Sequence, residues 1–316
     1  MRKMWNMLKK LCVSIILCSL LLCFANLSSV EAWSNGGLST DPSSPKYGTH
    51  DWIGQHALDW LPDEEKQFIT GNLNLYLYGT ELPDNGKAPD GIGDSAKHHF
   101  YYNSAKAVID DASAVRASEV YIQTLNFLKS GDLADGVKYA GAMTHYIADL
   151  AVFGHVMGAG TPWGSERHHS DYEDYVNGRT STYVSEFNSY LIFDGKLETL
   201  SAYDAAKNLA YDTTFDSSGN GLTCVWMDQN YDWSNPTFKN RCGESLNLGV
   251  NYLADVLHTL WLEAGKPIPE FKLGFKTALI LSVIVLIAAS VLRVQLPRKR
   301  NYNKIISDSK RSLVKA

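Results

Sequence analysis

Apolar residues recur mostly at intervals of three and four along this chain, which is the period of an α-helix with one buried face. Between residues 244 and 264, for example, the stripe consists of Leu246, Val250, Leu253, Leu257 and Leu260. Runs that alternate apolar and polar residues, as in half-buried strands, are scarce. We therefore predict an all-α fold, a single mostly helical domain. Its predicted helices span residues 63–78, 105–128, 132–152, 171–190, 201–211 and 244–264.

An apolar run near the start of the chain has a different character. Residues 1–10 are basic, residues 11–25 are almost wholly apolar, and Val30-Glu31-Ala32 offers small residues at the two positions that a signal peptidase reads. This order predicts a secretory signal peptide at 1–32, removed after Ala32 so that Trp33 becomes the new N-terminus. The alternative is an uncleaved membrane anchor, although the apolar stretch is short for a span.

A second apolar run follows the helical region. Residues 266–272 form a short linker with prolines, and residues 273–292 carry Lys276 as their only charge. We predict a transmembrane helix at 273–292, because Lys276 can extend to the interface and the tail at 293–316 is basic. Positive residues favour the cytoplasmic side, so the domain at 33–265 would face outward, tethered to the cell membrane. The alternative is a buried hydrophobic helix.

Composition narrows the possible functions. The domain has roughly 230 residues, enough for one buried core. The formal net charge of −5 argues against a broad basic surface and a stable nucleic-acid partner.

Residues 215–243, rich in Asp, Asn, Ser and Gly, are predicted to form a long irregular insertion. After signal cleavage, Cys224 and Cys242 are the remaining cysteines, and we expect a disulfide between them to close this insertion. It would be either a flap over the site or a surface loop.

The most informative chemistry lies between residues 145 and 173. His145 and Asp149 are one helical turn apart, as are His169 and Glu173, and His155 lies between the two pairs. Imidazole and carboxylate at this spacing are the ligands that zinc takes. The run holds more ligands than a single zinc needs, so we predict a multi-zinc hydrolytic centre. A lone histidine is more often a surface or core residue, and His258 is interpreted in that way.

The chain here resembles the zinc-dependent phospholipase C family of secreted bacterial enzymes, which shares its architecture with fungal single-strand-specific nucleases. The resemblance begins with a Trp at the processed N-terminus. A His before an apolar helix, an Asp in a loop and a His before aromatics follow in that order, and the run just described comes last. The positions that carry it, in order, are Trp33, His50, Asp84, His99, His145, Asp149, His155, His169 and Glu173.

The resemblance implies about three zinc ions per chain. His99, His145 and Asp149 would hold the first together with Asp84. Trp33, His50 and the bridging Asp149 would hold the second. His155, His169 and Glu173 would hold the third. Asp84 would be the catalytic residue, as general base or water-orienting group. Neighbouring candidates remain for several positions: His98 for His99, His168 for His169, and Asp90 or Asp94 for Asp84.

Three functions are consistent with these residues. The first is phospholipase C-type hydrolysis of phospholipids at a membrane surface, the second a nuclease-like phosphodiesterase, and the third a non-enzymatic metal-binding surface protein. Glu173, rather than Asp, favours the lipase branch. Choline-specific members place aromatics directly after the loop Asp and three residues before the next His, where this chain has Asn85 and Ala96. A preference for phosphatidylcholine is therefore not supported.

Overall fold

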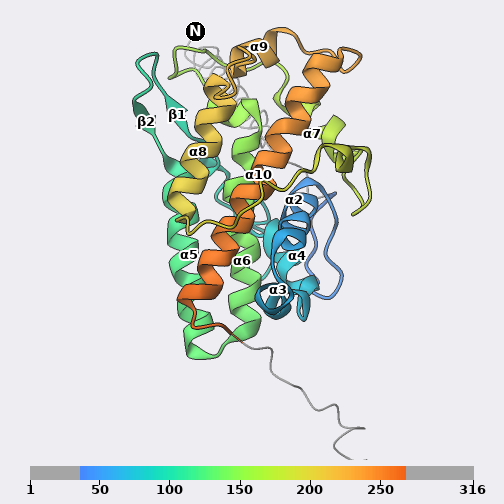
Figure 1. The fold of residues 1–316 in the computed structure, drawn as a ribbon, viewed down its shortest axis with the longest axis vertical. Coiled ribbons are helices and arrows are strands. Elements are labelled where there is room, and N and C mark those ends of the chain that lie inside the picture. Colours follow the sequence, from blue (N-terminus) through green and yellow to red (C-terminus); the bar gives the residue numbers. More distant parts are fainter. Residues whose placement is uncertain (1–35, 268–316) are drawn as a thin grey trace, which may run out of the picture. The chain divides into compact units, whose positions relative to one another are not determined.

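The computed structural model describes residues 36–267, and helices dominate this part of the chain (Figure 1). The prediction of a mostly helical domain is therefore confirmed, whereas the predictions for 1–32, Trp33 and 273–292 lie outside the described residues. The elements are α2 (Thr49–Ala57), η1 (Leu58–Trp60), α3 (Asp63–Thr70), α4 (Leu73–Glu81), η2 (Ser95–Lys97), β1 (Tyr101–Tyr102), β2 (Val108–Asp110), α5 (Ala112–Ser130), α6 (Leu133–Ala148), η3 (Asp149–Ala151), η4 (Phe153–Val156), α7 (His169–Asn177), η5 (Glu186–Tyr190), α8 (Ala202–Phe215), α9 (Cys224–Gln229) and α10 (Pro236–Glu263).

Helix α6 lies at the centre of the packing. It contacts α5 on one side and α4 on the other, and α10 packs against α2, α6 and α8. The predicted apolar stripe of α10, from Leu246 to Leu260, is buried in this core. Burial of such a stripe supplies most of the stability of a helical domain.

Two glycines set the distance between α4 and α6. A Cβ atom at Gly79 would lie 1.9 Å from the carbonyl oxygen of Lys138, and one at Gly141 would lie 2.0 Å from that of Tyr76. Only glycine permits such a close approach of two backbones. The contact holds the loop that follows α4, which contains Asp84, beside the last turns of α6.

Several predicted helix boundaries are wrong. The predicted helix 63–78 is interrupted at Gly71, where α3 ends. The predicted helix 105–128 begins only at Ala112, because β1 and β2 form an antiparallel hairpin in which Tyr101 pairs with Asp110. The predicted helix 171–190 ends at Asn177, before Gly178. Glycine is a poor helix former, and at two of these three places it decides the boundary.

About half of the predicted insertion 215–243 is helical, and residues 216–223 and 230–235 are irregular, as predicted. It contains α9, and α10 begins inside it at Pro236 rather than at 244. Proline suits the first turn of a helix, and the side chain of Asn235 caps the helix by accepting from the Thr237 N–H.

The predicted disulfide is wrong. Cys224 and Cys242 are free thiols, and each is fully buried within the hydrophobic core, on α9 and α10 respectively. A buried ion pair holds this region instead. Arg241 Nη2 lies 2.8 Å from Asp212 Oδ2, and Arg241 Nε donates to the carbonyl of Leu222 at 3.2 Å. The pair thus ties α10 to α8 and to the segment before α9.

Among residues 36–267, no helix combines the length and the apolar character needed to cross a bilayer. The predicted span at 273–292 lies outside this range.

Candidate metal centre

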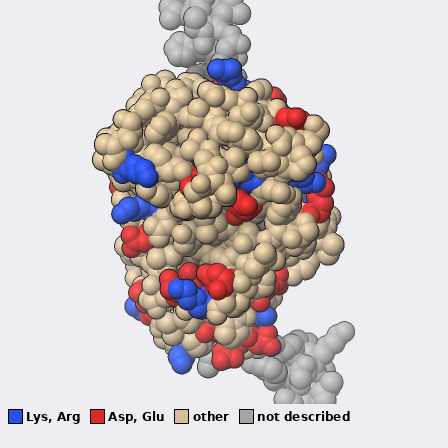
Figure 2. Space-filling view, turned by 45° about the horizontal axis from the view of Figure 1, so that its top comes forward, with Lys and Arg blue, Asp and Glu red and all other residues tan. Residues whose placement is uncertain are grey.

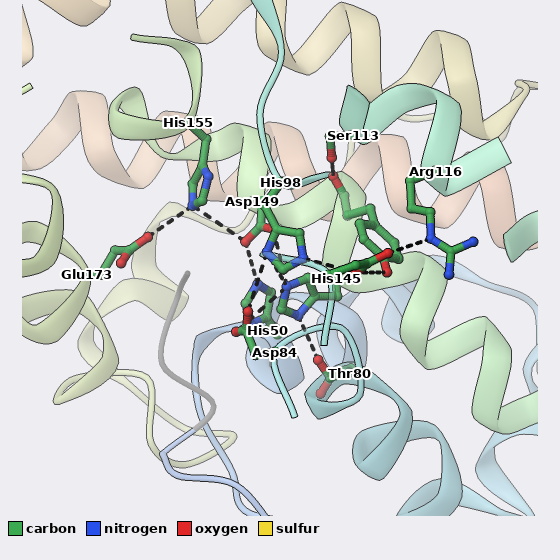
Figure 3. A network of polar contacts seen from close by, with 12 residues as sticks. His50, Thr80, Asp84, His98, Ser113, Arg116, His145, Asp149, His155 and Glu173 are labelled. Atoms are coloured by element: carbon green, nitrogen blue, oxygen red, sulfur yellow. Dashed lines mark hydrogen bonds and ion pairs between the residues drawn. The ribbon is translucent and has the colours of Figure 1, made fainter. Parts of the chain in front are cut away.

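Seven of the nine predicted ligands come from separate segments and lie in clusters near the C-terminal end of α6: His50, Asp84, His145, Asp149, His155, His169 and Glu173. Figure 3 shows all of these except His169. His50 lies in the first turn of α2, and Asp84 lies in the loop after α4. His145 is in the last turn of α6, and Asp149 begins η3 directly after that helix. The glycine contact between α4 and α6 brings the loop with Asp84 close to the last turn of α6, which carries His145.

The first cluster consists of His50, His145 and Asp149, all fully buried. His50 Nε2 lies 2.9 Å from Asp149 Oδ1, and His145 Nε2 lies 3.2 Å from Asp149 Oδ2. The two imidazole rings are stacked, with their centroids 3.9 Å apart. The prediction groups His50 and Asp149 with Trp33, which lies outside the described residues, and places His145 in the Asp84 group; in the structure His145 lies in both clusters.

The second cluster consists of Asp84, His98 and His145. His98 Nδ1 lies 3.4 Å from Asp84 Oδ1 and 3.2 Å from Asp149 Oδ2, and His145 Nε2 lies 3.8 Å from Asp84 Oδ2. Asp149 therefore faces both clusters, with Oδ1 toward His50 and Oδ2 toward His98 and His145. This geometry agrees with the bridging role expected for Asp149.

The structure places His98, not the predicted His99, in this cluster. His98 is 2% exposed, whereas the His99 side chain is 23% exposed, stacks on Tyr101 and lies with Nε2 2.9 Å from Asp110 Oδ2. The physical reason is that His99 leads into the β1–β2 hairpin and turns toward β2, while His98, at the end of η2, turns inward. The spacing of ligands along the chain could not separate these adjacent residues.

The third cluster consists of His155, His169 and Glu173, as predicted. Glu173 Oε1 lies 3.1 Å from His155 Nε2 and 2.9 Å from His169 Nε2. His155 Nε2 also lies 3.7 Å from Asp149 Oδ1, so this cluster adjoins the first. His168, the rival candidate, is turned away and stacks on Tyr231.

In two cluster histidines, the ring nitrogen that faces away from the cluster makes a hydrogen bond to a group that the sequence did not indicate. His145 Nδ1 donates to the carbonyl of Thr80 at 2.7 Å, and His169 Nδ1 donates to Glu166 Oε1 at 3.2 Å. A hydrogen bond at Nδ1 leaves the Nε2 lone pair facing the cluster, which is the usual support of a metal-bound imidazole. The three-residue spacing of Glu166 and His169 is a signal that could have revealed the second contact.

The insertion supports the third cluster from outside. Asp228 of α9 accepts from the backbone N–H of Arg167 at 2.7 Å and from that of His168 at 3.3 Å. These residues immediately precede His169, the first residue of α7. The segment thus helps to fix the start of the helix that carries His169 and Glu173 of this cluster.

Burial and neighbouring charges shift the pKa values of the cluster residues. Burial raises the pKa of Asp84. Burial acts in the same direction on Asp149, but His145, His155 and His98 outweigh it and hold the pKa of Asp149 well below its usual range. Burial, aided by His145, lowers the pKa of His50 to about 4. For His145 burial opposes protonation, yet Asp149 and Asp84 raise its pKa to about 9.

The donor set of the clusters fits zinc. Each cluster offers nitrogen and oxygen atoms that lie within 4.8 Å of one another. Imidazole nitrogens face each other at 3.3 Å, between His98 Nδ1 and His145 Nε2, and at 3.4 Å, between the Nε2 atoms of His155 and His169. Asp149 Oδ2 is buried without a hydrogen-bond partner in the described part of the chain. A cation among these atoms would satisfy groups that are otherwise costly to bury.

We expect zinc binding to release protons. The pKa of His145 is raised to about 9 and that of His169 to about 10, the latter because Glu166 and Glu173 outweigh burial. Both imidazoles are therefore protonated near neutral pH before metal binds, and zinc requires them neutral. Protons compete with zinc below these pKa values, so the affinity should rise as pH is raised from 6 toward 9.

The measurement is calorimetric titration of the metal-free protein with zinc, at one pH, in buffers of different ionisation enthalpy. About two protons per chain should be released near pH 7. A His258→Gln variant is the control, because His258 pairs with Glu65 and belongs to none of these clusters. A heat that is the same in every buffer would contradict the prediction.

Comparisons with known proteins identify the family of this chain. Residues 49–247 match the family described as zinc dependent phospholipase C. Among solved structures, alpha toxin from Clostridium absonum is similar at 14% identity and a TM-score of 0.47, covering 75% of this chain and 66% of the toxin. Alpha-toxin from an avian strain of Clostridium perfringens is similar at 16% identity and a TM-score of 0.38, covering 71% and 65%. The chain thus spans about two thirds of the length of these toxins.

No curated protein matches the chain in sequence. The family match confirms the prediction of zinc as the cofactor, and the clusters of the described residues agree with about three ions per chain. Because the matched residues make up more than half of the chain, it belongs to the zinc-dependent phospholipase C family.

Proposed function

We propose that this chain is an exported phosphodiesterase that hydrolyses phospholipids in the manner of a phospholipase C, releasing the phosphorylated headgroup. The observation that supports this most strongly is Asp149, whose two oxygens face adjacent clusters with Asp84 alongside. Zinc bound there would supply a hydroxide near neutral pH and stabilise negative charge on phosphate oxygens.

Asp84 is the residue that we assign to proton transfer. Both of its carboxylate oxygens face cluster histidines, and its side chain is 8% exposed, whereas those of His145 and Asp149 are fully buried. It is therefore the more accessible carboxylate of these two clusters. Burial raises the pKa of Asp84 in the metal-free protein, and a carboxylate at this position could accept a proton from the attacking water.

The surface favours a lipid over a long polyanion. Figure 2 shows a face on which uncharged residues predominate and Lys and Arg are scattered rather than gathered into a patch. The net charge of −5 is unsuited to long nucleic acid. A membrane-bound phospholipid is therefore the substrate that we propose.

Choline is not the headgroup that we propose. Asn85 is 2% exposed, and its side-chain amide donates to the carbonyl of Ser39 at 2.7 Å, so it braces the N-terminal segment. With His98 as the ligand, the other choline-contacting position is Ser95 rather than Ala96. Neither residue offers an aromatic face to a quaternary ammonium.

We further propose that the protein is exported by its signal peptide and tethered by residues 273–292. Helix α10 passes η3, which carries Asp149, and ends at Glu263; the end of this helix lies in the lower part of Figure 1. Gly249 lies near Ala151 of η3, so Glu263 is about 20 Å further along the helix at 1.5 Å per residue. A C-terminal anchor would therefore join the domain at the end remote from the clusters.

The test is a paired assay of the purified, processed protein on phospholipid–detergent micelles and on single-stranded DNA. We expect release of phosphorylated headgroup that stops with a chelator and returns with zinc. Cleavage of DNA alone would favour the nuclease-like alternative. A protein that binds zinc and turns over neither substrate would favour the non-enzymatic one.

A further inference from the structure

A polar network lies on the outer side of His98, away from the clusters (Figure 3). His98 presents Nδ1 to Asp84, Asp149 and His145, so its Nε2 points in the opposite direction. This Nε2 is buried and makes no hydrogen bond within the described part of the chain. The group in front of it is the carboxylate of Asp94, with Oδ1 at 3.6 Å.

Two strong donors hold the Asp94 carboxylate in place. The hydroxyl of Tyr146 donates to Oδ1 at 2.6 Å, and Arg116 Nε donates to Oδ2 at 2.7 Å. Tyr146 directly follows the ligand His145 on α6, and its carbonyl accepts from Ser113 Oγ at 2.6 Å. The carboxylate is therefore tied to α5 and α6 at the same time.

Asp94 lies where a carboxylate can accept a hydrogen bond from the ring nitrogen of His98 that faces away from the metal cluster. A small rotation of the His98 ring would shorten 3.6 Å to a hydrogen bond of about 2.9 Å. In that geometry the Nε2–H donates to Asp94 and the Nδ1 lone pair faces the cluster. Such a bond fixes the tautomer and the orientation of the ligand. Thr80 and Glu166 play the equivalent part for His145 and His169.

We propose that Asp94 is a positioning residue that holds His98 in its metal-binding orientation, and that Arg116 and Tyr146 position Asp94 in turn. The proposal rests on the metal centre of the proposed function. In sequence, Asp94 is a rival of Asp84 for the catalytic position. The structure instead places it behind a ligand, where it acts on the metal through His98.

The chain offers a closely matched control. Asp90 also accepts from a tyrosine, with Tyr78 OH at 2.7 Å, and from a cation, with Lys138 Nζ at 2.8 Å. It belongs to the same loop as Asp94, and no histidine of the described residues contacts it. Asp90→Asn therefore changes the same kind of carboxylate without touching a metal ligand.

The experiment compares Asp94→Asn and Asp90→Asn with the wild-type protein. Zinc affinity is measured by competition with a chromophoric chelator, and the ligand field by the visible spectrum of the cobalt-substituted protein. In Asp94→Asn we expect zinc to bind one site about 10- to 100-fold more weakly and the cobalt spectrum to shift. We also expect kcat to fall with little change in KM. Asp90→Asn should match wild type in every measurement.

Wild-type affinity and an unchanged cobalt spectrum in Asp94→Asn would overturn the proposal. If Asp94→Asn does not fold, Arg116→Gln and Tyr146→Phe provide the test, because each removes one donor and leaves the carboxylate. Both should weaken zinc binding several-fold, and wild-type affinity in both would again overturn it. A wild-type protein that binds zinc but cleaves no phospholipid would refute the proposed function alone.

Discussion

His98→Ala is expected to weaken zinc binding at the Asp84 cluster by more than about 100-fold and to lower kcat/KM by a similar factor or more. Loss even of a group behind a ligand costs about 10- to 100-fold, and a direct ligand should cost more. His98 is buried with Nδ1 3.2 Å from Asp149 and 3.4 Å from Asp84. Its removal takes one nitrogen donor away from these two carboxylates.

His99→Ala is the matched control, because it alters the adjacent residue. His99 lies beside Asp110 on the partly exposed hairpin, so zinc content and activity should remain near those of wild type. Zinc per chain is measured by elemental analysis after exhaustive dialysis, and activity by headgroup release. A result in which His99→Ala loses zinc and His98→Ala keeps it would reverse the assignment made from the structure.

Asp84→Asn is expected to lower kcat by about 10²- to 10⁴-fold, the range for loss of a group that transfers a proton in the transition state. An amide keeps the shape of the side chain but cannot accept a proton. The clusters of His50, His145 and Asp149 and of His155, His169 and Glu173 do not contain Asp84, so they should retain their zinc.

Steady-state kinetics and zinc content measured on the same samples separate the catalytic role from ligand loss. Asp110→Asn is the control, since that carboxylate faces His99 outside the clusters, and it should leave kcat unchanged. A rise in KM with an unchanged kcat would show that Asp84 contributes to binding only.

The parts of the site that could be predicted are those governed by local geometry. His145 with Asp149 and His169 with Glu173 are each one helical turn apart, and a helix turns such pairs to one side whatever surrounds it. The buried stripe of α10 follows from the same periodicity. Several helix ends nevertheless differ from the predicted ones at a glycine or a proline. Whether a helix breaks at Gly71 or begins early at Pro236 depends on how the neighbouring segments pack.

Residues outside regular helices could not be placed in this way. His98 and His99 are neighbours in an irregular segment, and the β1–β2 hairpin decides which of them faces Asp84. The cysteine count suggested a disulfide. In the structure each thiol is instead buried separately in the core, and the Arg241–Asp212 ion pair ties α10 to α8. Neither outcome has a periodic signal in the chain.

The amino-acid sequence by itself determined the helical class, the family and most of the residues that the structure brings together in the three clusters, because these depend on residue types at short, regular spacings. Only the tertiary structure decided that His98 completes the Asp84 cluster, and that Thr80, Asp94 and Glu166 stand behind the cluster histidines. The contacts of His98 with Asp149 and of His145 with Thr80 join segments far apart in the chain, so they exist only once those segments have packed together, whereas Asp94 and Glu166 lie three or four residues from their histidines and only the fold of these irregular segments turns them toward the rings.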